Sequence, residues 1–477
     1  MRTRDLRQPH AGCGVAGARG VPQPGWGTIF GVPPRVRGAN WLLAVACCLG
    51  GLCWAARAES RPPNIVLILA DDLGWGDVGF NGRTEWSTPR LDRLAAEGVV
   101  FRRWYSGAVV CAPSRAVLMT GRYGIHNGVV TNSADLPRGE VTLAEALAEA
   151  GYVCALYGKW HHGRPRAGEA SYVHPLDQGF AEFRGFTNAR HAWEQFPTQL
   201  WFGREQRPVQ GHANTLFTDW ACEFIRAHRQ QPFFLYLPYI ATHFHIQAPA
   251  EEVAEHVGKF PERDPADPVY ATYAAMVTSL DKQIGRVLDL LDELGLAEQT
   301  IVIFSSDHGA TFEQGNRGAS AFHDSNRPFR GGKRSLWEGG IRVPGLVRWK
   351  GHIPAGGETH VPVHMMDLFP TLLAAAGIQR SDLALDGIDL LPLWLHGERP
   401  PERTLFWEWR SEGYQQLAAM RGDLKLVICG GQPPELYNVE TDPGERRSLH
   451  AEYPELTAEL RAALDAWLAT EVPEARQ

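Results

Sequence analysis

The sequence predicts an α/β protein in which a large mixed, mostly parallel central sheet is flanked by helices. A small C-terminal antiparallel sheet with a helix is expected to follow. Three observations support this fold class. Residues 64–70 are a continuous apolar, β-branched run, which is typical of a strand buried on both faces. Similar short runs then alternate with segments of helical periodicity. After residue 378, short strand candidates follow one another closely, which is typical of an antiparallel sheet.

The elements of the first part are predicted in chain order. Strands are expected where short runs are rich in β-branched or aromatic residues, at 64–70, 152–157, 233–237 and 301–304. Helices are expected where apolar residues recur at helical spacing, at 91–97, 143–150, 218–228 and 270–294. A further helix is expected to begin at Cys111, because Pro113 suits a first turn and Ala116 to Met119 are good helix formers.

The second part is predicted to be smaller. Strands are expected at 404–409, 416–420 and 424–427, followed by a turn-rich segment at 438–444 and an amphipathic helix from about 455 to 468. The predicted organisation is therefore a larger domain at 61–378 and a smaller C-terminal α+β domain at 379–477.

Composition and charge exclude some classes of function. The chain has 477 residues, of which 44% are hydrophobic and 21% charged, an ordinary globular composition that allows two or three domains. Its net charge of -7 offers no basic surface for nucleic acid, so no nucleic-acid partner is expected. Any site for an anion must therefore be built locally.

Residues 1–60 are predicted to be a leader that contains a secretory signal peptide. Arg35 and Arg37 precede an apolar region at about 41–53, and Ala56-Arg57-Ala58 offers a cleavage site, so cleavage is expected near Ala58. The protein is therefore expected to be periplasmic or secreted, or lysosomal or extracellular in a eukaryote. An uncleaved leader acting as an anchor is the alternative, and it is the only membrane contact expected.

Cys111 has the most informative surroundings of the four cysteines beyond the leader. The other three are Cys154, Cys222 and Cys429, and the four form no disulfide framework. A thiol at a helix start experiences the positive end of the helix dipole, and Arg115 lies one turn along. This environment favours negative charge. The alternative is a buried structural cysteine before an ordinary helix.

Carboxylates, a lysine and histidines follow four of the predicted strands. They are Asp71 and Asp72, then Lys159 and His161, then His243, then Asp307 and His308. Open α/β sheets bind ligands at the carboxyl ends of their strands, so these side chains are expected to meet at one edge. Adjacent carboxylates such as Asp71 and Asp72 repel each other, and a hard divalent cation relieves that repulsion.

Four motifs resemble those of one enzyme family. Residues 111–115 read Cys-Ala-Pro-Ser-Arg and are followed by Thr-Gly-Arg, and residues 158–161 read Gly-Lys-Trp-His. Residues 233–249 place histidines before Gln-Ala-Pro, and residues 329–344 place Lys333 before Glu-Gly-Gly-Ile-Arg-Val-Pro. The chain resembles the sulfatases over nearly all of residues 62–470. Cys154 and Tyr157 depart from the usual residues of the second motif, at positions where no chemistry is expected.

The resemblance implies an alkaline-phosphatase-like fold, formylglycine (3-oxoalanine) made from Cys111, and one Ca²⁺ ion. The implied metal ligands are Asp71, Asp72, Cys111, Asp307 and His308. His308 either binds the ion or supports a ligand, because many relatives have asparagine there and imidazole is soft for Ca²⁺. The implied catalytic residues are Cys111, Arg115, Lys159, His161, His243 and Lys333. A formylglycine-generating enzyme is an implied partner during maturation.

The implied reaction is hydrolysis of a sulfate monoester of a carbohydrate or an aryl alcohol. The cation, Arg115, Lys159 and Lys333 would neutralise the sulfate oxygens. Asp307 would orient or deprotonate the attacking hydroxyl and His161 would assist elimination. His243 would protonate the departing alcohol, with His245 as the alternative.

Two other functions stay open from the sequence. One is a phosphonate monoester or phosphodiester hydrolase of the same superfamily, and the other is a non-catalytic secreted binding protein. The organic part of the substrate depends on segments 186–212 and 315–326, which are expected to be loops. Aromatic residues of the first segment suggest stacking on a sugar or aryl ring, with surface packing as the alternative: Trp193, Phe196, Trp201 and Phe202.

Overall fold

The computed structural model describes residues 61–163, 173–411 and 413–476. The predicted leader, with its signal peptide and the alternative of an anchor, lies outside the described residues. Within the described ranges, no helix is both long and apolar enough to cross a membrane.

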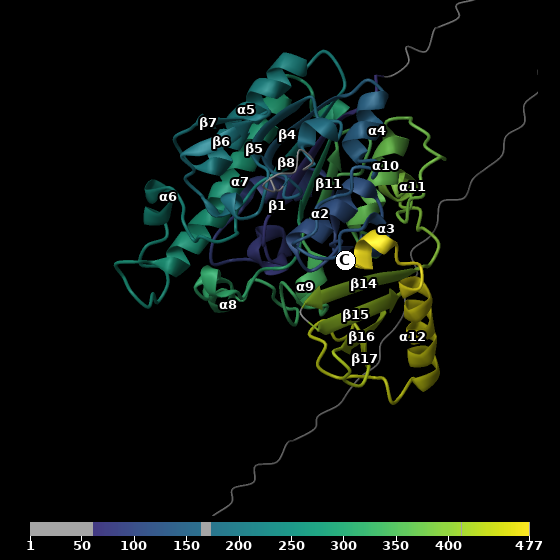
Figure 1. Ribbon diagram of the computed structural model, residues 1–477. Coiled ribbons are helices and arrows are strands. Elements are labelled where there is room, and N and C mark those ends of the chain that lie inside the picture. Colours follow the sequence, from purple (N-terminus) through teal and green to yellow (C-terminus); the bar gives the residue numbers. More distant parts are fainter. Residues whose placement is uncertain (1–60, 164–172, 412, 477) are drawn as a thin grey trace, which may run out of the picture. The chain divides into compact units, whose positions relative to one another are not determined.

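A ten-stranded sheet forms the centre of the described chain (Figure 1). Its strands, in spatial order, are β12 (Gly357–Thr359), β2 (Val99–Phe101), β11 (Gly345–Trp349), β9 (Thr300–Ser306), β1 (Asn64–Ala70), β8 (Phe233–Pro238), β4 (Val153–Lys159), β5 (Glu182–Phe186), β6 (Gln199–Phe202) and β7 (Glu205–Pro208). The five strands from β9 to β5 are parallel, while β11, β6 and β7 run antiparallel to their neighbours. The predicted mixed, mostly parallel sheet is confirmed.

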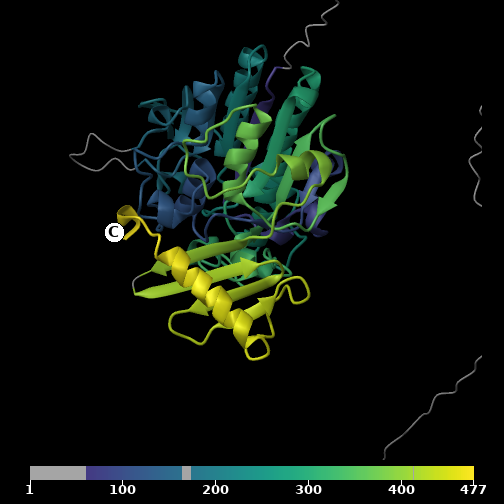
Figure 2. The same cartoon turned by 90° about the vertical axis from the view of Figure 1, so that its right-hand side faces the viewer.

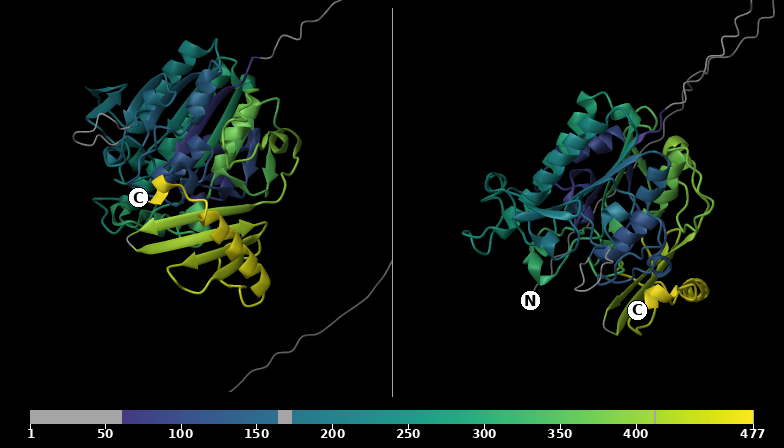
Figure 3. Two further views of the ribbon diagram at one scale, coloured as in Figure 1. Left: turned by 45° about the vertical axis from the view of Figure 1, so that its right-hand side comes forward. Right: turned by 45° about the horizontal axis from the view of Figure 1, so that its top comes forward.

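Helices cover both faces of this sheet (Figures 1 and 3). One face is covered by α1 (Pro89–Glu97), α5 (Ala213–His228) and α7 (Val269–Glu293), and the other by α2 (Cys111–Thr120), α4 (Leu143–Glu149) and α10 (Leu368–Ala375). Alternate residues of β1 enter the two cores, with Val66 and Ile68 on one face and Leu67 and Leu69 on the other. This double burial explains why β1 is apolar throughout.

The C-terminal part is an antiparallel sheet of four strands with one helix across it, as predicted (Figure 2). The strands are β14 (Thr404–Ser411), β15 (Tyr414–Arg421), β16 (Leu424–Cys429) and β17 (Glu435–Asn438), and the helix is α12 (Pro454–Leu468). Leu460 and Leu464 of α12 pack into a third core with Leu417 of β15. The same core contains Leu336 and Ile341, so the small sheet packs directly on the segment that carries Lys333.

The remaining α-helices and strands are short. They are α3 (Gly124–Asn127), α6 (Ala250–Ala254), α8 (Ala319–Phe322), α9 (Glu338–Ile341), α11 (Leu391–His396) and a three-stranded sheet of β10 (Arg342–Val343), β3 (Trp104–Tyr105) and β13 (Val363–His364). The domain division at residue 378 stays a prediction. Trp394 of α11, which follows residue 378, packs in the same core as Phe369 of α10, which precedes it.

The expectation that 186–212 and 315–326 are loops is wrong in part. The first segment contains β6 and β7, which extend the central sheet beyond β5, and the second contains α8. The strand β7 has the sequence Glu-Gln-Arg-Pro and is exposed throughout, so it carries no apolar alternation. Its pairing with β6 therefore makes this segment a strand, although its own sequence does not predict one.

Candidate active site

The carboxyl ends of the central strands bring the predicted residues together. Asp71 and Asp72 directly follow β1, Lys159 is the last residue of β4, and Asp307 directly follows β9. The ends of these strands are tied to one another, since the Asp307 amide donates to the Ala70 carbonyl at 3.0 Å. The prediction that these side chains meet at one edge is confirmed by the contacts between them.

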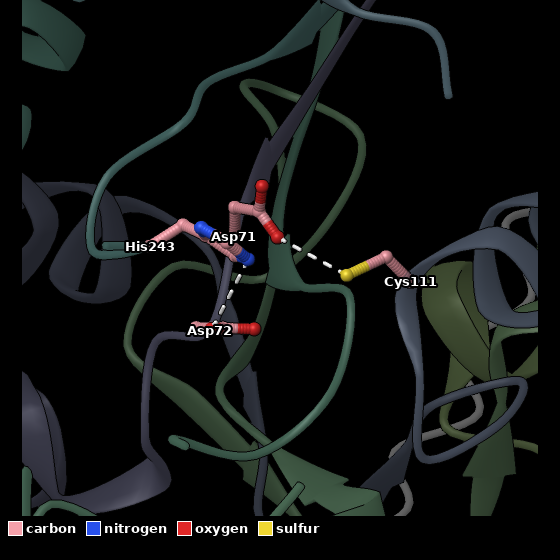
Figure 4. A group of neighbouring side chains, drawn as sticks. All are labelled: Asp71, Asp72, Cys111 and His243. Carbon is pink, nitrogen blue, oxygen red and sulfur yellow. Dashed lines mark hydrogen bonds and ion pairs between the residues drawn. The ribbon is translucent and has the colours of Figure 1, made fainter. Parts of the chain in front are cut away.

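Cys111 begins α2 and points at this edge. Its Sγ lies 3.6 Å from Oδ1 of Asp71 and 3.2 Å from Nε2 of His308, and the residue is 2% exposed. Figure 4 shows the Cys111 side chain directed toward Asp71 and the His243 side chain toward Asp72. The start of α2 is therefore held against the strand ends, with its thiol inside the site.

Three buried cations pair with the three carboxylates. Lys159 donates to Asp71 at 2.6 Å, and Lys333 donates to the two oxygens of Asp72 at 2.9 and 3.1 Å. The third pair is Arg115 and Asp307, at 2.8 Å. Lone charges at this depth would be very costly, so each ion depends on its partner.

The pairing changes the proton affinity of the buried groups. Burial by itself would raise the pKa of Asp71, but Lys159 and Arg115 hold it well below its ordinary value. Burial by itself would lower the pKa of Lys333, but Asp72 and other nearby negative groups raise it well above its ordinary value. The site therefore keeps Asp71 ionised and Lys333 protonated.

Asp72 has an unusual backbone conformation. Its φ of 62° is in the left-handed region, which residues other than glycine rarely adopt. The conformation is held by the Asp72 amide, which donates to Asp307 Oδ1 at 3.2 Å, and by the Thr242 hydroxyl, which donates to the Asp72 carbonyl at 3.0 Å. Backbone strain of this kind clusters at functional sites.

The donor set fits a hard divalent cation. Asp71, Cys111, Asp307 and His308 each offer a ligand atom within 4.8 Å of the others, and Asp72 belongs to an overlapping group. Each of the two carboxylates uses one oxygen for its short ion pair and directs the other oxygen at this group of ligand atoms. Asp71 Oδ1 faces Cys111, and Asp307 Oδ1 lies 3.7 Å from His308 Nε2. Carboxylate oxygens converging in this way suit Ca²⁺.

His243 and Lys333 lie side by side at the other end of the cluster. His243 Nε2 is 3.4 Å from Lys333 Nζ and 3.7 Å from Asp72 Oδ2. Burial lowers the pKa of His243, with Asp72 opposing that shift. The alternative histidine, His245, is exposed. The geometry therefore favours His243 over His245 beside the carboxylates.

His161 is also buried at this edge, two residues beyond β4. Neither of its ring nitrogens has a hydrogen-bond partner within the described ranges. Burial and the nearby Lys159 lower its pKa well below the ordinary value, which keeps the imidazole neutral. The neutral ring keeps a nitrogen lone pair that can accept a hydrogen bond or a proton, and its lowered pKa makes it a weak base.

Sequence reasoning missed Glu313. Its carboxylate lies 3.1 Å from Lys333 Nζ and also pairs with the exposed Arg334. Burial would raise the pKa of Glu313, but Lys333 and Arg334 lower it to about 2. No motif marks this residue, and only the folded chain brings it to Lys333.

Of the four aromatic residues expected near the substrate, Trp193 lies beside the site. Its ring stacks near that of His243, with centroids 6.4 Å apart. Phe202 instead packs on Trp220, Phe196 packs on His212, and Trp201 packs against the core on the face covered by α2, α4 and α10. Of the four residues suggested to stack on the substrate, Trp193 is therefore the one placed next to the strand ends.

Comparisons with known proteins agree with this geometry. The family model named Sulfatase matches residues 63–378. N-acetylgalactosamine-6-sulfatase of Mus musculus is 38% identical, in an alignment that covers 86% of this chain and 85% of the relative. Arylsulfatase A of Homo sapiens is 33% identical, with 86% and 88% covered.

Solved structures give the same result. The crystal structure of Ps i-CgsB matches with a TM-score of 0.79 and 30% identity, covering 87% of this chain and 94% of that one. The phosphonate monoester hydrolase of Agrobacterium radiobacter has the same fold at a TM-score of 0.62 and 23% identity, covering 85% and 96%. With the family shown by both sequence and structure, the chain belongs to the sulfatases and is an enzyme that hydrolyses sulfate esters.

Proposed function

We propose that this sulfatase removes sulfate from carbohydrates, using a formylglycine at position 111 and a bound Ca²⁺ ion. The observation that carries the proposal is the position of the Cys111 sulfur, which lies among the three carboxylates at the strand ends. Its relatives include N-acetylgalactosamine-6-sulfatases, and Ps i-CgsB has also been solved in complex with k-i-k-neocarrahexaose. Both relatives point to sulfated sugars.

Formylglycine and Ca²⁺ would supply chemistry that the thiol and the side chains lack. A formylglycine hydrate carries two hydroxyls on one carbon, so that one can attack sulfur and the other can later expel sulfate. A Ca²⁺ ion held by Asp71, Asp72 and Asp307, with His308 and residue 111 beside it, would add positive charge for the sulfate oxygens.

The cations of the site would bind and orient the sulfate group. Each of Arg115, Lys159 and Lys333 already neutralises a carboxylate, so a divalent cation would make the pocket net positive. That excess charge would suit an anionic ester and the charge that develops as the S–O bond breaks. Lys333 is the best placed to reach the bridging oxygen, because it adjoins His243.

Proton transfer is assigned to three groups of the site. Asp307, whose Oδ2 is held by Arg115, would orient and deprotonate the attacking hydroxyl. His243, which lies beside Lys333 and Asp72, would give a proton to the departing alcohol, and neutral His161 would take one during elimination. Maturation would require a formylglycine-generating enzyme, and the predicted leader implies export.

The test is a substrate comparison. Sulfated mono- and oligosaccharides, an aryl sulfate and an aryl phosphodiester are assayed with the purified enzyme and with Cys111→Ala as the blank. We expect kcat/KM for the sulfate esters to exceed that for the phosphodiester, with sulfated sugars turned over. A phosphodiester preference, or turnover of aryl sulfate with none of a broad set of sulfated sugars, would contradict the proposal.

A further inference from the structure

We infer that Gln416, a side chain of the small C-terminal sheet, is a positioning residue for Lys333. The small sheet would then take part in catalysis by holding the loop that carries the lysine. The inference rests on the role proposed above for Lys333. It goes beyond that role because Gln416 lies in the C-terminal sheet, not in the central sheet whose strand ends carry the carboxylates.

Gln416 binds the backbone on both sides of Ser335. Its Oε1 accepts from the Leu336 amide at 2.9 Å, and its Nε2 donates to the Arg334 carbonyl at 3.1 Å. Gln416 is 4% exposed, so these two bonds form away from water. The Gln416 side-chain amide has one donor and one acceptor, and it pairs with the loop backbone just after Lys333 in the way that a neighbouring strand would.

The other side of the loop is tied to the catalytic edge. The Lys333 amide donates to the Ala310 carbonyl at 3.1 Å, and the Arg334 amide donates to the carbonyl of Val109, two residues before Cys111, at 3.0 Å. Arg334 itself has a φ of 70°, which a side-chain-bearing residue keeps only when its surroundings hold it. Gln416 supplies that support from the C-terminal sheet.

A second contact from the same sheet fixes the end of the loop. Lys425 of β16 donates to the Leu336 carbonyl at 3.1 Å and pairs with Glu338 and Glu445 at 2.7 Å each. Glu445 in turn accepts from the Glu338 amide at 2.6 Å. These groups are fully buried, so the loop cannot shift at its C-terminal end without breaking a buried ion network.

The position of Lys333 is sensitive to such support. Its Nζ lies among Asp72, Glu313 and His243 at 2.9 to 3.4 Å, so a small displacement of the backbone would change all three contacts. Misplacing a catalytic group by about 1 Å costs on the order of 100-fold in rate. Removal of the Gln416 amide should therefore appear as lost kcat.

The experiment is a double-mutant cycle with an aryl sulfate as the substrate. The four proteins are the wild type, Gln416→Met, Lys333→Ala and the double variant; methionine keeps the volume of glutamine and removes its hydrogen bonds. Gln415→Met is the matched control, because Gln415 is the adjacent residue of β15 and is exposed. Melting temperature is measured for every protein, and Gln416→Asn replaces the methionine variant if that protein does not fold.

We expect Gln416→Met to lower kcat about 10- to 100-fold with KM changed less than about threefold, and to have less than a twofold effect when Lys333 is already alanine. Gln415→Met should leave kcat unchanged. An equal loss in both backgrounds, or an unchanged kcat in Gln416→Met, would overturn the inference. An unchanged kcat in Lys333→Ala would instead show that the proposed role of Lys333 is wrong.

Discussion

Lys333 and Asp72 are 261 residues apart in the sequence, yet the Lys333 amino group donates to Oδ1 of Asp72 at 2.9 Å in the buried site. This pair joins the end of β1 to the loop that packs on the C-terminal sheet. It places a compact positive charge next to His243 and beside the carboxylates at the strand ends. The first prediction concerns this charge.

Lys333→Ala should lower kcat by roughly two to three orders of magnitude, the usual scale for deleting one electrostatic stabiliser. Lys333→Arg should recover little, because the guanidinium is larger and planar and does not fit the space among Asp72, Glu313 and His243. Steady-state kinetics with an aryl sulfate measures both effects.

Arg334→Ala is the control for Lys333. Arg334 is the next residue, but its side chain is exposed and pairs with Glu313 at the surface. Equal losses in the two alanine variants, or a loss of binding alone in Lys333→Ala, would mean that the loop only recruits anionic substrates.

Asp72→Asn should weaken Ca²⁺ binding and activity together. The change removes one of the three carboxylate charges at the strand ends and leaves Lys333 paired with Glu313 alone. Metal content after dialysis, followed by titration with Ca²⁺, measures binding independently of turnover.

The matched control for the metal site is Asp382→Asn, which removes a carboxylate that is exposed and pairs with Arg380. This variant should retain full metal content. If exhaustive chelation left the rate unchanged and the purified protein contained no metal, the proposed cation would be wrong.

The stability of the protein should depend on the protonation of Asp281, a buried residue of α7. This carboxyl accepts from the amides of Arg90 and Leu91 at the start of α1. Burial raises its pKa to about 6 from 3.8, and the backbone hydrogen bonds only partly oppose the rise. The folded state therefore binds the proton more tightly than the unfolded chain.

Because the folded pKa is raised, the Asp281 contribution is complete below about pH 4 and is lost as the pH rises to about 6. The unfolding free energy of the wild type, minus that of Asp281→Asn, should fall over this window by up to about 3 kcal/mol. Denaturant unfolding at several pH values measures the difference. Asp289→Asn, at an exposed position of the same helix, is the control variant for these measurements.

The residues at the strand ends could be predicted from the sequence, whereas the residues that hold Lys333 in place could not. Asp71 and Asp72 could be placed because they follow an apolar run that only a doubly buried strand explains, and Cys111 because Pro113 and Arg115 surround it with a recognisable pattern. The contacts of Glu313 and Gln416 could not be predicted, because each depends on segments that meet only after folding. Strand β7 was missed because all of its side chains face solvent.

The oxidation state of residue 111 tests the central claim most directly. Mass spectrometry of the peptide that contains Cys111, from a fully active preparation, should show a mass about 18 Da lower than that of the cysteine peptide. The peptide containing Cys154 is the internal control. Burial raises the pKa of that thiol to about 12, and it should stay unmodified. A fully active enzyme in which residue 111 is entirely free cysteine would contradict the account.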